Sequence, residues 1–131
     1  VHSVSSTKVV RGLGRARISS ASALNVCIQV NLCQDAKKSG VALEELSDII
    51  AAVNSEPMLD LRGLMLIPPQ GLSQVQLSSV FKQMFELKCQ LVQQGCEMDT
   101  LSMGMSQDYA LAINFGSTMV RVGQAIFGER N

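Results

Sequence analysis

The sequence contains little of what metal centres and disulfide frameworks require. Its four cysteines, Cys27, Cys33, Cys89 and Cys96, form no Cys-x-x-Cys pair, and His2 is the single histidine. Because zinc sites draw on several thiolate and imidazole ligands at short spacings, no metal site is predicted. Cys27 lies in an apolar strand-like run and Cys89 in a helical pattern, where cysteine packs as a small hydrophobe. We interpret these cysteines as reduced structural residues, in keeping with a cytoplasmic protein.

An excess of charge and a long apolar run are also absent. Eleven basic side chains balance eleven acidic ones, and they are scattered, whereas a polyphosphate partner requires a basic stripe. No apolar run approaches the ~20 residues of a membrane span, and no signal-peptide pattern occurs. Nucleic acid and membranes are therefore not expected as partners. The composition, 47% hydrophobic and 17% charged, is typical of a globular domain.

Strand-like and helix-like segments alternate along the chain. The clearest strand covers Leu24 to Leu32, which is rich in β-branched residues and too short for a helix. Further strands are predicted over residues 1–4, 59–67, 100–102 and 118–122, with a loop over 33–40. Helices are predicted from about residue 5 to 17, 41 to 55, 73 to 94 and 106 to 116, with at most a turn or two after Gly123.

This alternation indicates parallel strands joined by right-handed crossovers. An open doubly wound sheet and a (β/α) barrel both fit, and the barrel is favoured because its ligand site lies after the last two strands. The end of this chain has that character: within residues 101–130 two strand-like runs stop at glycine or serine before a helix. Unpaired N–H groups at such helix starts attract anions. The sequence therefore predicts an anion site there.

The same segment carries a family pattern. Leu-Ser-Met-Gly-Met-Ser (101–106), Gly-Ser-Thr-Met-Val-Arg-Val-Gly (116–123) and Ala-Ile-Phe-Gly-Glu-Arg (125–130) resemble the C-terminal signature of the pyridoxal-phosphate homeostasis proteins, single-domain relatives of the alanine racemase barrel. Val-His-Ser-Val-Ser (1–5), Val-Cys-Ile-Gln-Val-Asn (26–31) and Leu-Arg-Gly-Leu-Met (61–65) fall in the order that the family shows. The resemblance covers essentially the whole chain.

The resemblance implies an α/β fold, a (β/α)8 TIM barrel of the alanine racemase N-terminal type. Five strands cannot close such a barrel, and the chain begins with Val1 and with strand residues. We therefore expect residues 1–131 to form one partial domain, about the last five β/α units, with three leading units outside this chain. Ser5 stands where the family usually has aspartate, and Cys33 stands near a usual serine.

The cofactor of the family is pyridoxal 5′-phosphate, attached through a Schiff-base lysine on the first barrel strand. No motif similar to Ala-Val-Ser-Lys occurs here, so that lysine is expected outside this chain. The resemblance implies that the backbone N–H groups of Gly123 and Gln124 bind the phosphate; a plain strand-to-helix turn is the alternative. It also implies a hydroxyl donor from Ser102, predicted at a strand end, where helix capping is the alternative.

Arg121 stands out from the residues alone. It lies between Val120 and Val122 in a strand expected to be buried, so its guanidinium points to the opposite side from both valines, the inside of a barrel. A buried arginine requires an acceptor or an anion. A carboxylate in a structural salt bridge is one candidate. The resemblance implies another, the pyridine nitrogen of the cofactor.

Other polar residues are weaker candidates. Met65 and Asn31 end strands on the same face and are proposed to line the pocket. The alternatives are that Met65 fills the core and that Asn31 bridges a loop. Ser117 and Thr118 follow a glycine but begin the last strand, which is the stability face of a barrel. We therefore interpret both as the turn out of the preceding helix.

The resemblance implies a cytoplasmic protein that binds pyridoxal 5′-phosphate and serves its homeostasis as a carrier, with no established catalysis. Pyridoxal-phosphate-dependent apo-enzymes are the implied recipients. A racemase-like enzyme is the alternative; it needs a catalytic tyrosine, and Tyr109, the only one, sits on a predicted outer helix. An interaction module without a ligand is a third possibility. The open sheet edges predict aggregation or pairing with another chain.

Overall fold

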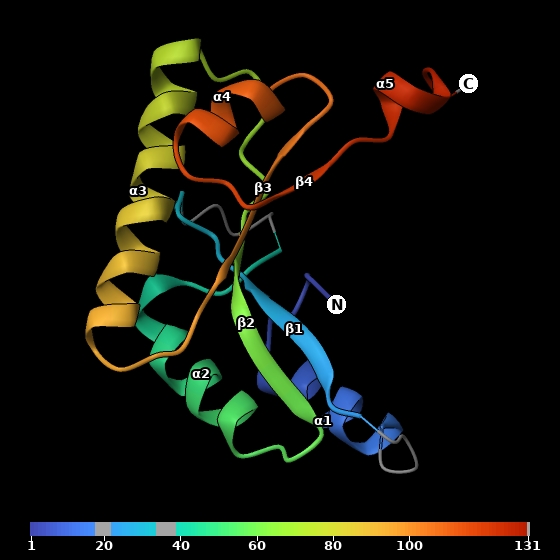
Figure 1. Cartoon of the computed structure of the whole chain (residues 1–131), viewed down its shortest axis with the longest axis vertical. Coiled ribbons are helices and arrows are strands. Elements are labelled where there is room, and N and C mark those ends of the chain that lie inside the picture. The colour runs from blue at the N-terminus through green and yellow to red at the C-terminus, as the bar shows by residue number, and fades with distance from the viewer. Residues whose placement is uncertain (18–21, 34–38, 131) are drawn as a thin grey trace.

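A computed structural model describes residues 1–17, 22–33 and 39–130, and shows a twisted parallel sheet with helices packed against it (Figure 1). The sheet contains β1 (Leu24–Gln29), β2 (Leu59–Met65), β3 (Thr100–Met105) and β4 (Met119–Arg121). The helices are α1 (Thr7–Ala16), η1 (Leu43–Glu45, a 3-10 helix), α2 (Leu46–Asn54), α3 (Gln74–Gln93), α4 (Tyr109–Asn114) and α5 (Gln124–Phe127).

The strand order is β1-β2-β3-β4, and every pair is parallel. The strand predicted over residues 1–4 is reduced to one parallel bridge, in which Val4 pairs with Ile28 beside β1. Neighbours in the sheet therefore follow the order of the chain. A doubly wound sheet reverses its strand order at a switch point, whereas a barrel does not. The sequential order thus confirms the barrel type of fold among the described residues.

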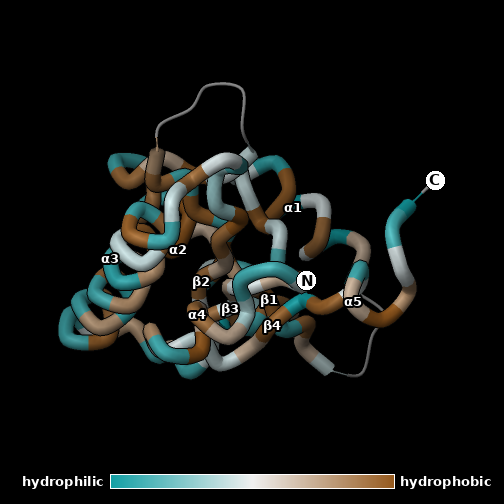
Figure 2. The backbone as a smooth tube through the Cα atoms, turned by 90° about the horizontal axis from the view of Figure 1, so that it is seen from above, coloured by the Kyte–Doolittle hydropathy of each residue, from teal (hydrophilic) through white to brown (hydrophobic). Residues whose placement is uncertain are grey.

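The main core lies between the helices and one face of the sheet. Alternate strand residues such as Val26, Ile28, Leu64, Leu101 and Met103 pack there against the buried sides of the helices. Viewed from above in Figure 2, the strands lie in the middle of the molecule, and α3 alternates between hydrophobic and hydrophilic residues. None of the helices in the described residues is long and apolar enough to cross a membrane.

The opposite face of the sheet carries a second set of residues. Cys27, Gln29, Met65 and Ser102 alternate with the core positions and are buried, yet they belong to no part of the helix-side cluster. Arg121 on β4 reaches this same set through Ser102. The helix-free face is therefore partly polar, which suits the inside of a barrel that holds a ligand.

Several element boundaries differ from the prediction for local reasons. The helix predicted from Val41 begins later, because Val41 forms a parallel bridge with Val30 and residues 43–45 form η1. The helix predicted over 73–94 is confirmed almost to the residue, since Ser73 and Gln76 form a reciprocal capping box. The loop predicted over 33–40 falls mostly outside the described residues.

The third strand is longer than predicted and continues past Ser102 to Met105. Gly104 makes this possible: it adopts a φ of +100°, and a Cβ there would lie 2.8 Å from the Cβ of Ala112. A side chain would be strained and crowded at this position. Glycine therefore lets α4 pack closely on β3, and it moves the end of the strand to Met105.

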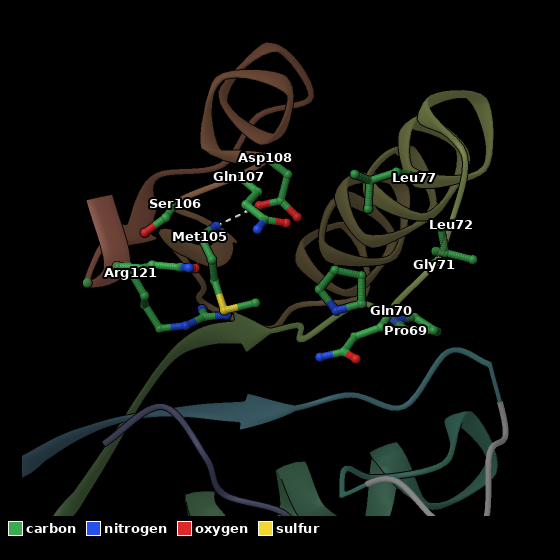
Figure 3. Close-up of a pocket in the computed structure, with 13 residues that line it drawn as sticks. Pro69, Gln70, Gly71, Leu72, Leu77, Met105, Ser106, Gln107, Asp108 and Arg121 are labelled. Carbon is green, nitrogen blue, oxygen red and sulfur yellow. Dashed lines mark hydrogen bonds between the residues drawn. The ribbon is translucent and has the colours of Figure 1, made fainter. Parts of the chain in front are cut away.

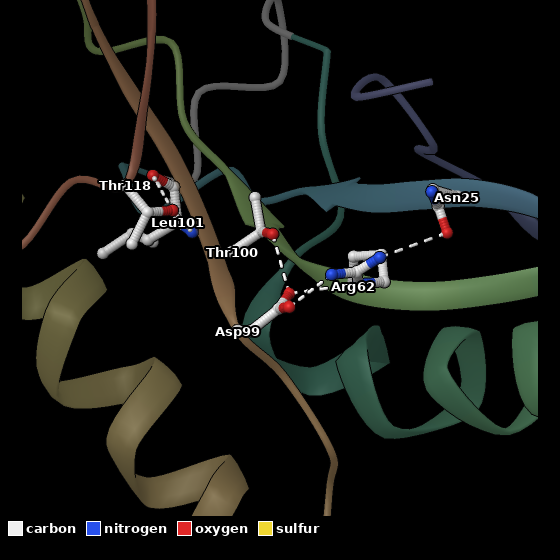
Figure 4. A network of polar contacts seen from close by, with 6 residues as sticks. All are labelled: Asn25, Arg62, Asp99, Thr100, Leu101 and Thr118. Atoms are coloured by element: carbon white, nitrogen blue, oxygen red, sulfur yellow. Dashed lines mark hydrogen bonds and ion pairs between the residues drawn. The ribbon is translucent and has the colours of Figure 1, made fainter.

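A polar cluster ties the amino-terminal ends of the strands together (Figure 4). Arg62 of β2 forms an ion pair with Asp99, and its Nε donates to Asp99 Oδ1 at 3.1 Å. The Thr100 hydroxyl donates to the same carboxylate at 2.8 Å, and Arg62 Nη1 lies 3.5 Å from Asn25 Oδ1 on β1. These contacts hold β1, β2 and the start of β3 in register at the end remote from the cavity described next.

Candidate functional site

An open cavity of about 790 Å³ lies at the carboxyl ends of β2, β3 and β4 (Figure 3). The loop after β2 forms one side with residues 68–72, and Leu77 of α3 adds to that side. The loop after β3 contributes residues 105–108, and β4 with the turn into α5 contributes Arg121, Gly123 and Gln124. The volume falls within the usual range for small-molecule sites. Parallel β/α folds bind their ligands at this end of the strands.

The loop after β2 forms a wall of low polarity. Pro68 and Pro69 have no backbone N–H group and restrict the backbone, and Gly71 takes a φ of +79° in the turn that follows. Leu72 and Leu77 continue this wall toward α3. This side of the cavity therefore suits the flat, apolar part of a ligand.

The loop after β3 forms a polar wall. A carboxylate oxygen of Asp108 accepts a hydrogen bond from the Met105 N–H at 2.7 Å, which fixes the turn before α4. The Ser106 hydroxyl accepts one from the N–H of Ala125 at 3.1 Å, and so connects this loop to α5. Ser106 thus lies beside the first turn of α5.

Arg121 lies across the floor of the cavity. Its Nη1 donates to Ser102 Oγ at 2.6 Å, and its Nη2 donates to the carbonyl oxygen of Leu66 at 2.9 Å. These contacts confirm that the side chain points to the helix-free face of the sheet. Burial lowers the pKa of Arg121, while the Asp108 carboxylate acts in the opposite direction. An arginine nevertheless stays protonated in a protein.

The carboxylate partner considered for Arg121 is not found. The ion pairs among the described residues are Arg62 with Asp99 and Lys82 with Glu86. Arg121 instead donates to one hydroxyl and one carbonyl, both neutral, so its positive charge is not neutralised by a direct partner in the part of the chain that the structure describes. An anion or an acceptor in the cavity would supply that partner.

The structure corrects the position predicted for Ser102. This residue lies in the middle of β3, is fully buried and does not line the cavity. Its hydroxyl contacts Arg121 and the Nδ1 atom of His2, the latter at 2.9 Å. Because β3 runs on to Met105, the serine that follows the strand end is Ser106. The helical pattern of residues 106–116 indicates only a helix start at Ser106 and does not single out its hydroxyl.

Gly123 and Gln124 line the cavity as predicted. No acceptor for their backbone N–H groups is present among the described residues, and a Cβ on Gly123 would meet nothing within 4 Å. The Gln124 side chain turns to Glu129, with Nε2 3.3 Å from Oε1. The two N–H groups therefore remain available at the polar end of the cavity.

Two other candidates lie away from the cavity. Met65 is the last residue of β2 and is buried, and Asn31 follows β1 with its N–H bonded to the Val41 carbonyl. Neither lines the cavity. Ser117 and Thr118 have the structural role predicted for them: Ser117 Oγ donates to the Met103 carbonyl at 2.6 Å, and Thr118 Oγ1 accepts from the Leu101 N–H at 2.7 Å.

A metal site finds no support in the part of the chain that the structure describes, where no group of three histidine, cysteine, aspartate or glutamate side chains gathers. The cavity instead presents the guanidinium of Arg121, the hydroxyl of Ser106, the carboxylate of Asp108, three glutamine side chains and free backbone donors next to an apolar wall. Its guanidinium and N–H donors suit an anionic group attached to a flat ring. Fold and cavity together define a class of protein: sequential parallel β/α units with a cavity of small-molecule size at the carboxyl ends of their strands.

Comparison with known proteins gives the family within this class. The chain belongs to the family of the alanine racemase N-terminal domain, whose model matches residues 1–131. A pyridoxal phosphate homeostasis protein of Pseudomonas aeruginosa is 43% identical over 131 residues, all of this chain and 56% of the relative. One of Escherichia coli is 42% identical over 130 residues, 99% of this chain and 56% of the relative. The chain thus spans little more than half the length of these relatives.

A solved structure agrees with this placement. The PipY protein of Synechococcus elongatus, with pyridoxal phosphate bound, superposes with a TM-score of 0.87 at 32% identity, over 97% of this chain and 59% of PipY. The resemblance drawn from the sequence motifs is therefore confirmed.

Proposed function

We propose that this chain forms the phosphate-binding and ring-binding part of a site for pyridoxal 5′-phosphate, in a protein that carries and supplies this cofactor. The observation that carries the proposal is Arg121, a half-buried guanidinium on the cavity floor with only neutral partners. The names of the curated relatives and the ligand in PipY agree with it. Apo-enzymes that use the cofactor are the proposed recipients, and the cytoplasm is the proposed location.

The cavity fits the cofactor in size and chemistry. The hydroxyl of Ser106 and the N–H groups of Gly123 and Gln124 would hold the phosphate, and the guanidinium of Arg121 would face the ring nitrogen. The wall formed by Pro69 and Leu72 would cover one side of the pyridine ring. Ser102 would act on the ligand only through Arg121, since it does not reach the cavity.

Arg121 also disfavours one class of catalyst, the aminotransferases. When bound, pyridoxal phosphate supplies a reactive aldehyde and a ring that withdraws electrons, most strongly when its nitrogen is protonated. A guanidinium keeps its proton, so Arg121 would donate a hydrogen bond to the ring nitrogen without transferring the proton. The ring would then accept electrons only weakly. This environment disfavours the carbanion chemistry of aminotransferases.

Racemase-like chemistry needs a catalytic acid or base in the cavity besides the Schiff-base lysine, and no suitable one lines it among the described residues. Tyr109 opens α4 and is 42% exposed, and it does not line the cavity. Asp108 does line it, but its carboxylate holds the Met105 N–H. None of the lysines in the described residues lines the cavity. We therefore favour the carrier function over an enzymatic one.

The binding experiment uses the complete polypeptide that contains these residues, with 4′-deoxypyridoxine 5′-phosphate as the probe. This compound lacks the aldehyde, so calorimetry measures recognition without a covalent bond. Removing a hydrogen bond to a charged group weakens binding about tenfold or more. We expect that loss for Arg121→Ala and for Ser106→Ala, and none for the control Ser55→Ala, whose hydroxyl donates to the Ala52 carbonyl on the surface. Affinity that is indifferent to both site variants would overturn the site.

A second measurement separates the carrier from the enzyme. Racemase assays on the same polypeptide, loaded with pyridoxal 5′-phosphate and offered several amino acids, should show no sustained turnover. Transfer to an apo-enzyme should occur, seen as recovery of that enzyme's activity. Robust racemisation would sink the carrier proposal while leaving the binding site intact.

A further inference from the structure

His2 is linked to the cavity although it lies next to the start of the chain. Its Nδ1 atom is 2.9 Å from Ser102 Oγ on β3, and the same oxygen is 2.6 Å from Arg121 Nη1 on β4. Arg121 then continues to the Leu66 carbonyl, just after β2. One short path of hydrogen bonds thus joins residues from four segments on the helix-free face of the sheet. The cavity-binding proposal makes no use of its first member.

The donors and acceptors along this path define the protonation state and the tautomer of the His2 imidazole. A guanidinium can only donate, so Ser102 Oγ accepts from Arg121. The hydroxyl still has one proton to donate, and Nδ1 of His2 is the acceptor within reach. All three groups are satisfied when His2 is neutral and carries its proton on Nε2. A protonated His2 would donate to Ser102 as well, and the buried hydroxyl proton would then have no acceptor in this path.

The charges around His2 favour the same state. Burial lowers the pKa of His2, and so does the positive charge of Arg121. The Arg121 charge also acts on the Cys27 thiol on β1, but burial raises the pKa of that thiol and keeps it neutral. Asp108 acts on Arg121 and is not among the groups that shift His2.

We propose that His2 is a positioning residue for Arg121: its neutral imidazole accepts a hydrogen bond from the Ser102 hydroxyl and so leaves a Ser102 lone pair to accept from Arg121, and protonation of His2 in acid loosens the guanidinium and weakens ligand binding. The second half of this inference rests on the proposed function, because it needs a ligand that contacts Arg121. The first half concerns only the hydrogen bonds of the chain itself. The two halves therefore have separate tests.

The first test is nitrogen NMR of the imidazole in the complete polypeptide, with the His2 signals identified by their loss in His2→Asn. We expect the neutral Nε2–H tautomer at about pH 8, with Nδ1 unprotonated, and a shift of the tautomer balance in Ser102→Ala. An Nδ1–H tautomer, or a cationic imidazole at that pH, would overturn the inference without any ligand being involved.

The second test compares pH profiles of affinity for 4′-deoxypyridoxine 5′-phosphate between about pH 8 and pH 5, which spans the usual titration range of histidine. His2→Asn places an amide oxygen near the position of Nδ1 and cannot titrate. It should bind as tightly as the wild type at about pH 8 and show a smaller loss in acid. The phosphate of the probe titrates in both proteins, so the difference between the profiles belongs to His2.

His2→Phe completes the set, since it fills similar space but offers no acceptor. We expect it to bind the probe about tenfold more weakly at about pH 8, and we expect the asparagine variant to restore that loss. A role in packing alone would give the reverse order, with phenylalanine the better substitute. Identical pH profiles for wild type and His2→Asn would overturn the inference. A wild type that fails to bind the probe at all would instead overturn the proposed function.

Discussion

At the scale of single residues, the ion pair between Arg62 and Asp99 makes the stability of the fold depend on pH. Arg62 grips both carboxylate oxygens, Thr100 adds a hydroxyl donor, and together they lower the pKa of Asp99 to about 2 from an ordinary value of 3.8. Both charged side chains are largely exposed, so solvent weakens the attraction. The sign of the effect is nevertheless defined by the direction of the shift.

We predict that this pair stabilises the fold above about pH 4 and that its contribution is lost as the pH falls from 3.8 to about 2. The folded state holds the ionised carboxylate more strongly than the unfolded chain does, so protonation removes the advantage. Asp99→Asn should therefore be less stable than the wild type at neutral pH and should approach it in acid. Urea unfolding at several pH values measures this difference.

The control for that series is Asp60→Asn, a neighbouring exposed carboxylate that accepts no hydrogen bond among the described residues and acts on Arg62 only through its charge. Its stability should follow the wild type more closely through the same pH range. A gap between Asp99→Asn and wild type that stays constant from neutral pH down to about pH 2 would contradict the assigned cause.

The residues of the site differ in how far sequence could identify them. The sequence identified Arg121 because successive side chains of a strand alternate between its two faces, so the guanidinium must lie on the face opposite to the two flanking valines. Gly123 was assigned from the family resemblance, since a glycine after a strand is also typical of a plain strand-to-helix turn. Ser102 and Ser106 could not be told apart, since the choice depends on where β3 ends. That end is set by the positive φ of Gly104 and its contact with Ala112, which no local pattern reveals.

At the scale of elements, the pairing of β1 with β2 contains an irregularity at Arg62. Val26 pairs with Leu61 but Cys27 pairs with Gly63, so Arg62 is an extra residue on β2. The bulge turns Arg62 toward Asp99 at the strand ends. It also brings Gly63 against β3, where a Cβ would overlap the carbonyl oxygen of Thr100. Glycine at 63 is therefore required by backbone packing.

We predict that Gly63→Ala destabilises the fold by about 2 kcal/mol or more, because β2 and β3 must move apart to make room for the methyl group. Denaturant unfolding measures the change. Gly12→Ala on α1 is the matched control: a Cβ there meets nothing within 4 Å, and alanine improves a helix interior by up to ~1 kcal/mol. Equal effects of the two substitutions would refute this account of Gly63.

Sequence patterns located the elements better than their ends. Hydrophobic spacing predicted α3 correctly. Its start agrees with the prediction because Ser73 and Gln76 form a capping box there. The start of α2 was wrong because Val41, which fits the helical period, is held by Val30 in a bridge between distant segments. Contacts that override local preference in this way arise only once the sheet has formed.

At the scale of the whole molecule, apolar side chains gather beyond the last strand. Ile126 and Phe127 of α5 are 68% and 85% exposed, and Met119 on β4 is 42% exposed. In Figure 1, α5 lies apart from the other helices, beyond β4, and β4 is the outer strand of the described sheet. Exposed apolar residues beside an unpaired strand edge promote association.

We predict that the 131-residue chain self-associates with rising concentration and that Phe127→Glu shifts it toward monomer. The charge would oppose burial of this region against a second copy. Analytical ultracentrifugation over a range of concentrations measures the shift. Val75→Glu is the control, since Val75 on α3 is similarly exposed, at 80%, and should leave the association unchanged. A wild type that stays monomeric at high concentration would contradict the prediction.

The fold class was accessible from the sequence because strand and helix alternate with short connections, and parallel pairing follows from that alternation. The sequential strand order chose between the two architectures that the pattern allowed. The extent of the domain, with three further units expected outside these residues, stays a prediction.

The path from His2 through Ser102 to Arg121 and Leu66 has a consequence for the order of folding. Its first hydrogen bond joins residues 100 positions apart, and its last joins residues 55 apart. Contacts between such distant residues close large loops and form late, after local helices and neighbouring strands. The guanidinium is therefore held in place only when nearly the whole chain has folded. A ligand that needs Arg121 would therefore bind the folded chain and not partly folded forms. Binding of such a ligand would report that these distant segments have come together.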